Sequence, residues 1–308
     1  PTMPDGEPWP YPERADVSTL AAATAVALAE QGVRRVRLGY DTSLFTGPAV
    51  NPRWEADYLP DEVTPTSALW VDEGFSSTRL SRLPDPSREA ADSFATALRA
   101  AGVRVVGTPE PATAPADALL LAQVDSAPLA QVVQRLLDVS DNEAAEVLLR
   151  HVGLARSGEG TTDAGRRAVR SLLARAGVRL GASTFYDGSG LSRANRAEPE
   201  VLLEVLRLAA DPTRPELRAV VEGLPVAGFT GSLSTRMDAG PPAGLGRVRA
   251  KTGTLSGVSS LAGVGTDLDG TAFVFVLMAD RVAESDVLAG RQALDSAAAA
   301  LGACRCSA

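Results

Sequence analysis

The residue best suited to chemistry in this 308-residue chain is Lys251, because it is the only lysine among 30 basic residues. A lysine ammonium is a compact charge on a flexible stem. It can change its protonation state or hold a small anion in ways that a planar guanidinium cannot. Lys251 is therefore the first candidate for a catalytic or anion-binding residue. The alternative is an ordinary surface lysine that escaped replacement by arginine.

The neighbours of Lys251 predict a strand that carries polar side chains. Lys251-Thr252-Gly253-Thr254 follows an alternating stretch, 247–250, and precedes a run of small residues from 255 to 264. Alternation of this kind is typical of a strand. Glycine inside a strand usually marks the close approach of another backbone or of a ligand. The segment is thus a candidate binding edge.

A second polar segment, Ser140-Asp141-Asn142, lies 111 positions upstream of Lys251 and leads into a predicted apolar helix over 144–152. Ser, Asp and Asn are all favoured at helix N-caps, and Glu143 suits the dipole of a first turn. A capping role would explain this tripeptide taken alone. Ser-Asp-Asn followed by Lys-Thr-Gly, however, is the signature of penicilloyl-serine transferases.

Further segments carry a closer resemblance. The sequences YDGSGLSR (186–193), LPVAG (224–228), GSLSTRM (231–237) and TSALWVDEG (66–74) resemble stretches of D-alanyl-D-alanine carboxypeptidases/endopeptidases of the DacB type, peptidase family S13. The resemblance spans nearly the whole chain and is strongest from about residue 130 to about residue 265. It implies a low-molecular-mass penicillin-binding protein that uses no cofactor.

The chain departs from this family at the nucleophile. The family acts through the serine of a Ser-x-x-Lys motif, whereas the residue three positions before the only lysine is Val248. In the family that motif precedes an inserted region, and this chain starts inside or just before the segment that resembles the insertion. We therefore expect a fragment that lacks its catalytic N-terminal segment. A paralogue that has lost its nucleophile is the alternative, and the sequence alone leaves both open.

The resemblance also implies roles in acyl transfer at a D-Ala-D-Ala amide. The missing serine would be the nucleophile and the lysine of its motif the base. The catalytic residues in this chain would be Ser140, Asn142 and Lys251. Ser140 can pass a proton to the departing nitrogen and Asn142 can orient the peptide. Lys251 would supply positive potential for the substrate carboxylate.

The substrate-binding residues implied by the resemblance are Thr252, Gly253 and Thr254. The two threonines supply hydroxyls, and the glycine lets the substrate chain approach. The backbone N–H of Thr254 would be one donor of the oxyanion site. The strand itself could pair with the substrate by β-addition. The implied partners are a peptidoglycan stem peptide and β-lactam antibiotics, and the implied location is extracytoplasmic.

Composition excludes several other classes of function. A net charge of −8 argues against a nucleic-acid partner. No apolar run approaches the ~20 residues of a transmembrane helix. The single histidine, His151, excludes a multi-histidine metal site, and we expect it at the C-terminal end of its helix. Cys304 and Cys306 are too close in sequence for an unstrained mutual disulfide, so pairing elsewhere or free thiols are expected.

The elements predict a mixed α/β fold in two domains. Residues 1–120 form an inserted α/β domain, in which a helix over 16–31 with a strand over 34–40 is nearly repeated by a helix over 87–101 with a strand over 103–106. The alternative is the first layer of one continuous domain. Residues 121–308 form an incomplete penicillin-binding, transpeptidase-like domain.

The second predicted domain combines long helices with an antiparallel sheet. Strands over 247–254, 259–266 and 271–278 are expected, the last two joined by a hairpin turn at 267–270. Helices should cover both faces of this sheet, and the predicted helices span 129–137, 142–152, 163–176, 198–210 and 285–301. The glycine-rich segments 187–190 and 228–232 could each line a substrate cleft or simply form turns.

The sequence thus predicts a serine-type D-Ala-D-Ala carboxypeptidase/endopeptidase whose nucleophile segment is absent. A non-catalytic peptidoglycan-binding or scaffold paralogue is the main alternative. A β-lactamase-like hydrolase is a third, although that core does not need an inserted domain. If one site is shared, Ser140 Oγ and Lys251 Nζ must lie within hydrogen-bonding reach or one water apart, with Asn142 facing the same cleft. A helix cap would instead turn the Ser140 hydroxyl toward the N–H groups of the next residues.

Overall fold

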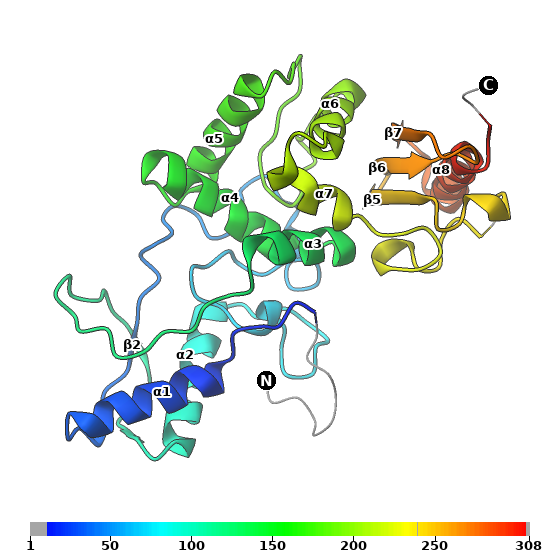
Figure 1. Ribbon diagram of the computed structural model, residues 1–308. Coiled ribbons are helices and arrows are strands. Elements are labelled where there is room, and N and C mark those ends of the chain that lie inside the picture. Colours follow the sequence, from blue (N-terminus) through cyan, green and yellow to red (C-terminus); the bar gives the residue numbers. More distant parts are fainter. Residues whose placement is uncertain (1–10, 239, 306–308) are drawn as a thin grey trace. The chain divides into compact units, whose positions relative to one another are not determined.

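The computed structural model describes residues 11–238 and 240–305. These residues form two compact units (Figure 1). The first unit contains the chain up to Leu129 together with Asn142–Arg166. The second contains Ala130–Asp141 and the chain from Arg167 onward. The mixed α/β architecture predicted from the sequence is confirmed.

Two helices build the N-terminal part of the first unit. Helices α1 (Val17–Glu30) and α2 (Pro86–Ala100) begin at Asp16 and Asp85, whose carboxylates accept hydrogen bonds from backbone N–H groups of the first turn. This is the usual reason why aspartate starts a helix. The two helices pack against each other around a small core that contains Ala21, Leu28, Leu98 and Val103.

The strands of the first unit are shorter than the sequence predicts. Parallel pairs join β1 (Arg35–Val36) to β3 (Arg104–Val105) and β2 (Gly39–Tyr40) to β4 (Glu110–Pro111). The predicted strand over 34–40 is therefore wrong in its middle. The partner segment between β3 and β4 contains Gly107, with φ at 74°, and Pro109, which has no N–H to donate, so the ladder is interrupted there.

The first unit also contains short 3-10 turns, the helix α4 (Asn142–Ser157) and the beginning of α5 (Thr162–Arg175). The 3-10 turns are η1 (Ala56–Tyr58) and η2 (Asp72–Gly74). Helix α4 runs five residues beyond its predicted end at Val152. The expectation that His151 lies at a helix C-terminus is therefore wrong, and its ring instead packs edge-on against Phe45 at 5.2 Å between centroids.

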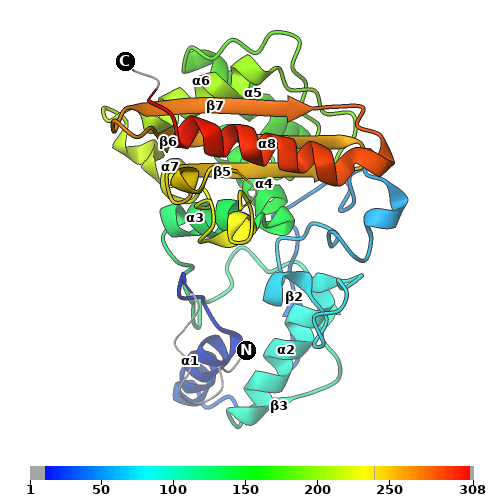
Figure 2. The same ribbon diagram turned by 90° about the vertical axis from the view of Figure 1, so that its right-hand side faces the viewer.

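The second unit is built on an antiparallel sheet in the order β5-β6-β7. Its strands are β5 (Val248–Leu255), β6 (Val258–Thr266) and β7 (Ala272–Ala279). Lys251 lies opposite Ala262 in the register. Helix α8 (Val287–Gly302) crosses one face of the sheet and α6 (Pro199–Ala210) lies on the other, as predicted (Figures 1 and 2).

The core of the second unit lies between the sheet and α8. Its buried members come from β5, β6, β7, α8 and the loop before β5, and they are Ala227, Leu233, Met237, Val248, Ala250, Leu261, Phe275, Ala298 and Ala299. The remaining elements of this unit are α3 (Leu129–Val139), η3 (Pro215–Leu217), α7 (Arg218–Glu222), η4 (Gly231–Leu233), η5 (Pro242–Gly244) and η6 (Glu284–Asp286).

Strand β5 is an edge of its sheet. Residues before Lys251 are covered on that edge by a single bridge between Val226 and Arg249, flanked by hydrogen bonds from Ala227 N to Val248 O and from Ala250 N to Pro225 O. Beyond this bridge, alternation along the strand turns the backbone groups of Thr252 and Thr254 toward the same edge.

Two further expectations concern the cysteines and the membrane. Cys304 is disulfide-bonded, so the free-thiol alternative is wrong for this residue, while Cys306 lies outside the described residues. Within residues 11–238 and 240–305, none of the helices combines the length and the apolar character that a bilayer crossing requires.

Candidate active site

Ser140 and Lys251 meet within the second unit. Lys251 Nζ donates a hydrogen bond to Ser140 Oγ at 2.7 Å and a second one to the backbone oxygen of Thr252 at 2.9 Å. The predicted contact across 111 positions of sequence is therefore confirmed. An ammonium so close to a hydroxyl oxygen stabilises any negative charge that develops on that oxygen.

The backbone at Ser140 excludes the helix-cap alternative. Ser140 follows the last residue of α3 with φ at 59°, in the left-handed region, and Asp141 N donates to Leu136 O. An N-cap residue takes an extended backbone instead. Helix α4 begins only at Asn142, so Ser140 lies in the turn between two helices, where its hydroxyl is free to face β5.

The charge of Lys251 is affected by its surroundings. Burial lowers the pKa of Lys251 from its ordinary value of 10.5 to about 8. The ammonium form is penalised because a half-buried charge loses hydration. The side chain is therefore charged below this pKa, but it can release a proton far more easily than a surface lysine. Both properties suit a residue that binds an anion beside a proton-transfer hydroxyl.

The residues after Lys251 have different structural roles. Thr252 Oγ1 donates to Ser232 Oγ at 3.2 Å. A Cβ added at Gly253 would lie 2.4 Å from Ser260 Oγ on the adjacent strand β6, a hydroxyl that would have to rotate to make room for it. Thr254 pairs with Ser259 in the register and is exposed. The binding roles of these three residues remain predictions.

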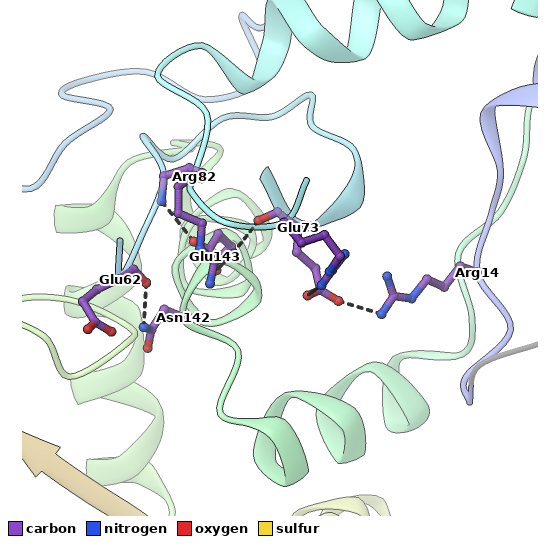
Figure 3. A network of polar contacts seen from close by, with 8 residues as sticks. Arg14, Glu62, Glu73, Arg82, Asn142 and Glu143 are labelled. Carbon is purple, nitrogen blue, oxygen red and sulfur yellow. Dashed lines mark hydrogen bonds and ion pairs between the residues drawn. The ribbon is translucent and has the colours of Figure 1, made fainter. Parts of the chain in front are cut away.

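Asn142 belongs to the first unit. Its amide nitrogen donates to Glu62 O at 3.1 Å, which ties the first residue of α4 to the loop after η1 (Figure 3). Next to it, Glu143 is only 4% exposed and accepts a hydrogen bond from Thr64 N at 3.0 Å. The first turn of α4 is thus anchored within this unit. The expectation that Asn142 faces the same cleft as Lys251 stays a prediction.

A network of charges holds this anchor in place (Figure 3). Arg82 lies 3.1 Å from a Glu143 carboxylate oxygen, donates to Glu73 O at 2.7 Å and stacks on the Phe75 ring at 3.6 Å. Arg14 pairs in turn with the Glu73 carboxylate at 2.6 Å. Removing one member of a buried pair leaves an uncompensated charge, so the network opposes local rearrangement of this segment.

The two glycine-rich segments that the sequence left undecided both belong to the second unit. Asp187, 8% exposed, accepts hydrogen bonds from Gly190 N, Ser192 N and Asn195 Nδ2, which is the pattern of a structured turn. Arg193, which follows this turn, donates to Ser256 O between β5 and β6 at 2.7 Å.

The second segment, 228–232, contains Ser232, which reaches Thr252. Sequence reasoning did not select Ser232 for this contact, because serine in a small-residue loop carries no distinctive signal.

Within the described part of the chain, His, Cys, Asp and Glu side chains nowhere gather in a group of three that could hold a metal ion.

The sequence is similar to known proteins over most of its length. Residues 79–301 match the sequence profile of the D-Ala-D-Ala carboxypeptidase 3 (S13) family. The chain is 33% identical over 308 residues to "Carboxypeptidase DacB" of Mycolicibacterium smegmatis, covering 96% of this chain and 65% of that protein. A "D-alanyl-D-alanine carboxypeptidase" of an Actinomadura species is 36% identical over 194 residues, covering 60% of this chain and 35% of the relative.

A solved structure has a similar fold. Penicillin binding protein 4 (dacB) from Haemophilus influenzae superimposes with a TM-score of 0.73 at 22% identity, covering 90% of this chain and 78% of that chain. At this identity the likeness concerns the fold. The chain spans less than two thirds of the length of the mycobacterial relatives that it matches, 65% of one and 59% of another.

Proposed function

Because this chain belongs to the D-Ala-D-Ala carboxypeptidase 3 (S13) family, we propose that it supplies the Ser-Asp-Asn and Lys-Thr-Gly elements of a serine-type D-Ala-D-Ala carboxypeptidase/endopeptidase. The substrate class is the peptidoglycan stem peptide. The observation that carries the proposal is the 2.7 Å hydrogen bond between Lys251 and Ser140, which joins the two motifs in one place. The names of the relatives, carboxypeptidases of bacteria, support the same reaction.

The reaction is acyl transfer from D-alanine to a serine. The nucleophile belongs to a Ser-x-x-Lys motif that is not among these 308 residues, since Val248 stands three positions before the only lysine. Attack by this serine forms a C–O bond at the penultimate carbonyl, and the C–N bond to the terminal D-alanine breaks. Water then hydrolyses the ester. Acylation needs an activated serine and a proton for the leaving amine, and hydrolysis of the ester needs an activated water and a proton for the leaving serine oxygen.

Ser140 is proposed to deliver that proton. Its oxygen accepts from the Lys251 ammonium, which leaves its own hydroxyl proton without an acceptor among the described residues. A hydroxyl in this arrangement can donate to the departing nitrogen while the neighbouring positive charge stabilises the resulting alkoxide. Lys251 also holds the carboxylate of the terminal D-alanine. In this proposal Asn142 orients the acyl side of the substrate.

Strand β5 is proposed to align the substrate chain. The backbone groups of Thr252 and Thr254 lie on the edge of β5 beyond the bridge at Arg249. An extended peptide can add to such an edge, so that main-chain hydrogen bonds place its carbonyl correctly. The N–H of Thr254 would then be one donor to the oxyanion. Gly253, which has no side chain, is proposed to let the substrate chain approach this edge.

The location of the protein and its binding of β-lactams are proposed from the same substrate class. Stem peptides lie outside the cytoplasm, so an extracytoplasmic location follows from the substrate. β-Lactams resemble the acyl donor, and the Haemophilus influenzae relative has been crystallised in complex with a β-lactam, which supports binding here.

We further propose that residues 1–120 form the inserted domain and residues 121–308 the incomplete catalytic domain.

The alternative is a peptidoglycan-binding or scaffold paralogue without a nucleophile. The gene sequence upstream of the Pro1 codon distinguishes the two. An in-frame Ser-x-x-Lys motif supports the enzyme. A start codon close to Pro1, with no such motif before it, supports the scaffold.

D-Alanine release from a stem pentapeptide tests the activity itself. The protein that carries the motif should release D-alanine, and Ser140→Ala should lower kcat by about a hundredfold through loss of proton transfer. Ser234→Ala, which removes an exposed hydroxyl from the same unit, is the control and should act like the parent. Full activity of the Ser140→Ala variant would remove Ser140 from the mechanism.

A further inference from the structure

The loop that carries Ser232 is firmly built into the second unit. Gly228 N donates to Leu233 O, and Leu233 is fully buried in the core beneath β5. Gly231 has φ at 48°, and a Cβ at this position would lie 2.2 Å from the backbone oxygen of Asp138, near the end of α3. The loop is therefore fixed from two sides, and the position of Ser232 between them is not free to drift.

Ser232 extends the polar group formed by Ser140 and Lys251. Its oxygen accepts the hydroxyl proton of Thr252 at 3.2 Å, and the backbone oxygen of Thr252 accepts from Lys251 at 2.9 Å. Lys251 in turn donates to Ser140 at 2.7 Å. Ser140, Lys251, Thr252 and Ser232 thus form a chain of hydrogen-bonded partners at the middle of β5.

Counting protons shows which donors in this group are unused. A lysine ammonium has three protons and each hydroxyl has one. Lys251 directs two protons to Ser140 and to Thr252 O, and Thr252 directs its proton to Ser232. Within residues 11–238 and 240–305, the third Lys251 proton and the hydroxyl protons of Ser140 and Ser232 have no acceptor. None of these side chains is fully buried, so a ligand can reach them.

A carboxylate matches this set of donors. It carries one negative charge and two oxygens that only accept hydrogen bonds. One oxygen can take the free Lys251 proton and the other can take the Ser232 proton. The Ser232 proton is a better donor because its oxygen already accepts from Thr252. A carboxamide offers one accepting oxygen and one donating NH₂, so one of the two donors would face another donor.

We propose that Ser232 is a specificity-determining residue that donates to the C-terminal carboxylate of the peptide held by Lys251. This assignment rests on the proposed function, because it takes the bound group to be the carboxylate of a terminal D-alanine. Its consequence is selective: Ser232 contributes to binding of a peptide acid and contributes little to binding of the matching peptide amide. A purely structural role of Ser232 would affect both ligands equally.

The single lysine provides a direct probe of this site in the chain as it stands. Incorporation of [ε-¹³C]lysine gives one protein resonance, from Lys251, and requires no catalytic activity. N-acetyl-D-Ala-D-Ala and its C-terminal amide are titrated separately while this resonance is followed by NMR. The parent protein should bind the acid at least about tenfold more tightly than the amide, because hydrogen bonds to a charged acceptor are the stronger ones.

Substitution of Ser232 should remove most of this preference. Ser232→Ala should weaken binding of the acid by about tenfold and of the amide by less than about twofold. Ser232→Thr keeps a hydroxyl and should restore the preference. Ser234→Ala, in the same loop region with an exposed side chain, is the matched control and should behave as the parent. The ratio of the two affinities is independent of the folded fraction of each variant.

The outcomes separate this inference from the function on which it rests. A parent that prefers the acid, together with a Ser232→Ala variant that keeps the parental preference, overturns the role of Ser232 alone. Equal weakening of both ligands in that variant also overturns it, since this indicates a structural role. A parent resonance that responds to neither ligand, or equally to both, overturns the carboxylate anchor at Lys251 and with it both proposals.

Discussion

At the scale of single residues, Lys251 should be intolerant of a change that keeps its charge. Its ammonium contacts Ser140 Oγ and Thr252 O through two short bonds, and the bulkier planar guanidinium of arginine cannot reproduce this geometry. In the protein that carries the nucleophile, Lys251→Arg should slow acylation by a β-lactam at least about tenfold, or about 1.4 kcal/mol of transition-state stabilisation. The rate constant is measured with a fluorescent penicillin. Acylation at the parental rate would end the assignment of Lys251 as the carboxylate anchor.

The protonation of Lys251 leads to a second prediction. Its pKa is lowered by burial to about 8, whereas the unfolded chain has the ordinary value of 10.5. Binding of a peptide carboxylate needs the ammonium, so affinity should be lost as the pH rises through about 8. Between these two values the unfolded chain binds a proton that the folded chain does not, so folding stability should increase with pH there.

The same [ε-¹³C]lysine resonance measures this pKa directly. A titration midpoint near 8 agrees with the burial of Lys251, and a midpoint at 10.5 would show an ordinary, hydrated lysine. Ser140→Ala removes an acceptor of the ammonium and should lower the midpoint further. Affinity for N-acetyl-D-Ala-D-Ala, followed over the same pH range, should fall with the same midpoint as the resonance titrates.

Sequence reasoning found the residues with unusual chemistry and missed those with ordinary chemistry. Lys251 is identifiable because it is the only lysine, and Ser140 because its tripeptide belongs to a known pair of motifs. Ser232 is one serine among many, and only the fold brings it to Thr252. The close approach of Ser260 Oγ to Gly253 was also hidden, because Ser260 lies on the neighbouring strand.

At the scale of elements, the pairing of β5 with β6 depends on Gly263. It lies opposite Ala250, and an added Cβ would be 1.9 Å from Arg249 O and 2.7 Å from the Cα of Ala250. These are backbone atoms that cannot move aside cheaply. Gly263→Ala should therefore destabilise the protein by about 3 kcal/mol, measured as the free energy of unfolding in urea.

Gly290→Ala is the matched control with the opposite sign. Gly290 lies inside α8, where its added Cβ would meet only Val282 at an ordinary 3.4 Å. Replacing glycine by alanine in a helix interior should stabilise the protein by about 0.5 to 1 kcal/mol. If both variants had the same effect on the free energy of unfolding, the steric argument for Gly263 would be wrong.

The long elements were predicted well because periodicity over many residues is a strong signal. The helices around 17–30, 86–100 and 199–210 and the three strands of the β5-β6-β7 sheet were placed within a few residues. The short strands were not, because two-residue pairs depend on their partners. The break between β1 and β2 comes from Gly107 and Pro109, which lie about 70 positions away in the sequence.

At the scale of the whole molecule, the chain passes between its two compact units at Leu129, at Asp141 and at Arg166. The second of these transitions falls inside the Ser-Asp-Asn motif, so Ser140 belongs to one unit and Asn142 to the other. The predicted division into residues 1–120 and 121–308 follows composition and the position of the helices. This division proposes which residues form an inserted domain. The two compact units are instead defined by which residues pack together.

Family membership and the lack of a Ser-x-x-Lys motif among these 308 residues together predict how this polypeptide should respond to a β-lactam. A stable covalent adduct requires the serine of Ser-x-x-Lys, and the residue three positions before Lys251 is Val248. In the proposed mechanism Lys251 acts as the ammonium that binds the carboxylate and Ser140 acts as a proton donor, so Ser140 should not replace that serine as a nucleophile. We therefore expect no adduct on these 308 residues, and a single adduct on a longer form that adds the motif. Intact-mass spectrometry after incubation with benzylpenicillin measures both. A stoichiometric mass increase on the 308-residue chain, located by peptide mapping to Ser140, would place the nucleophile inside this chain and overturn the proposed division of roles.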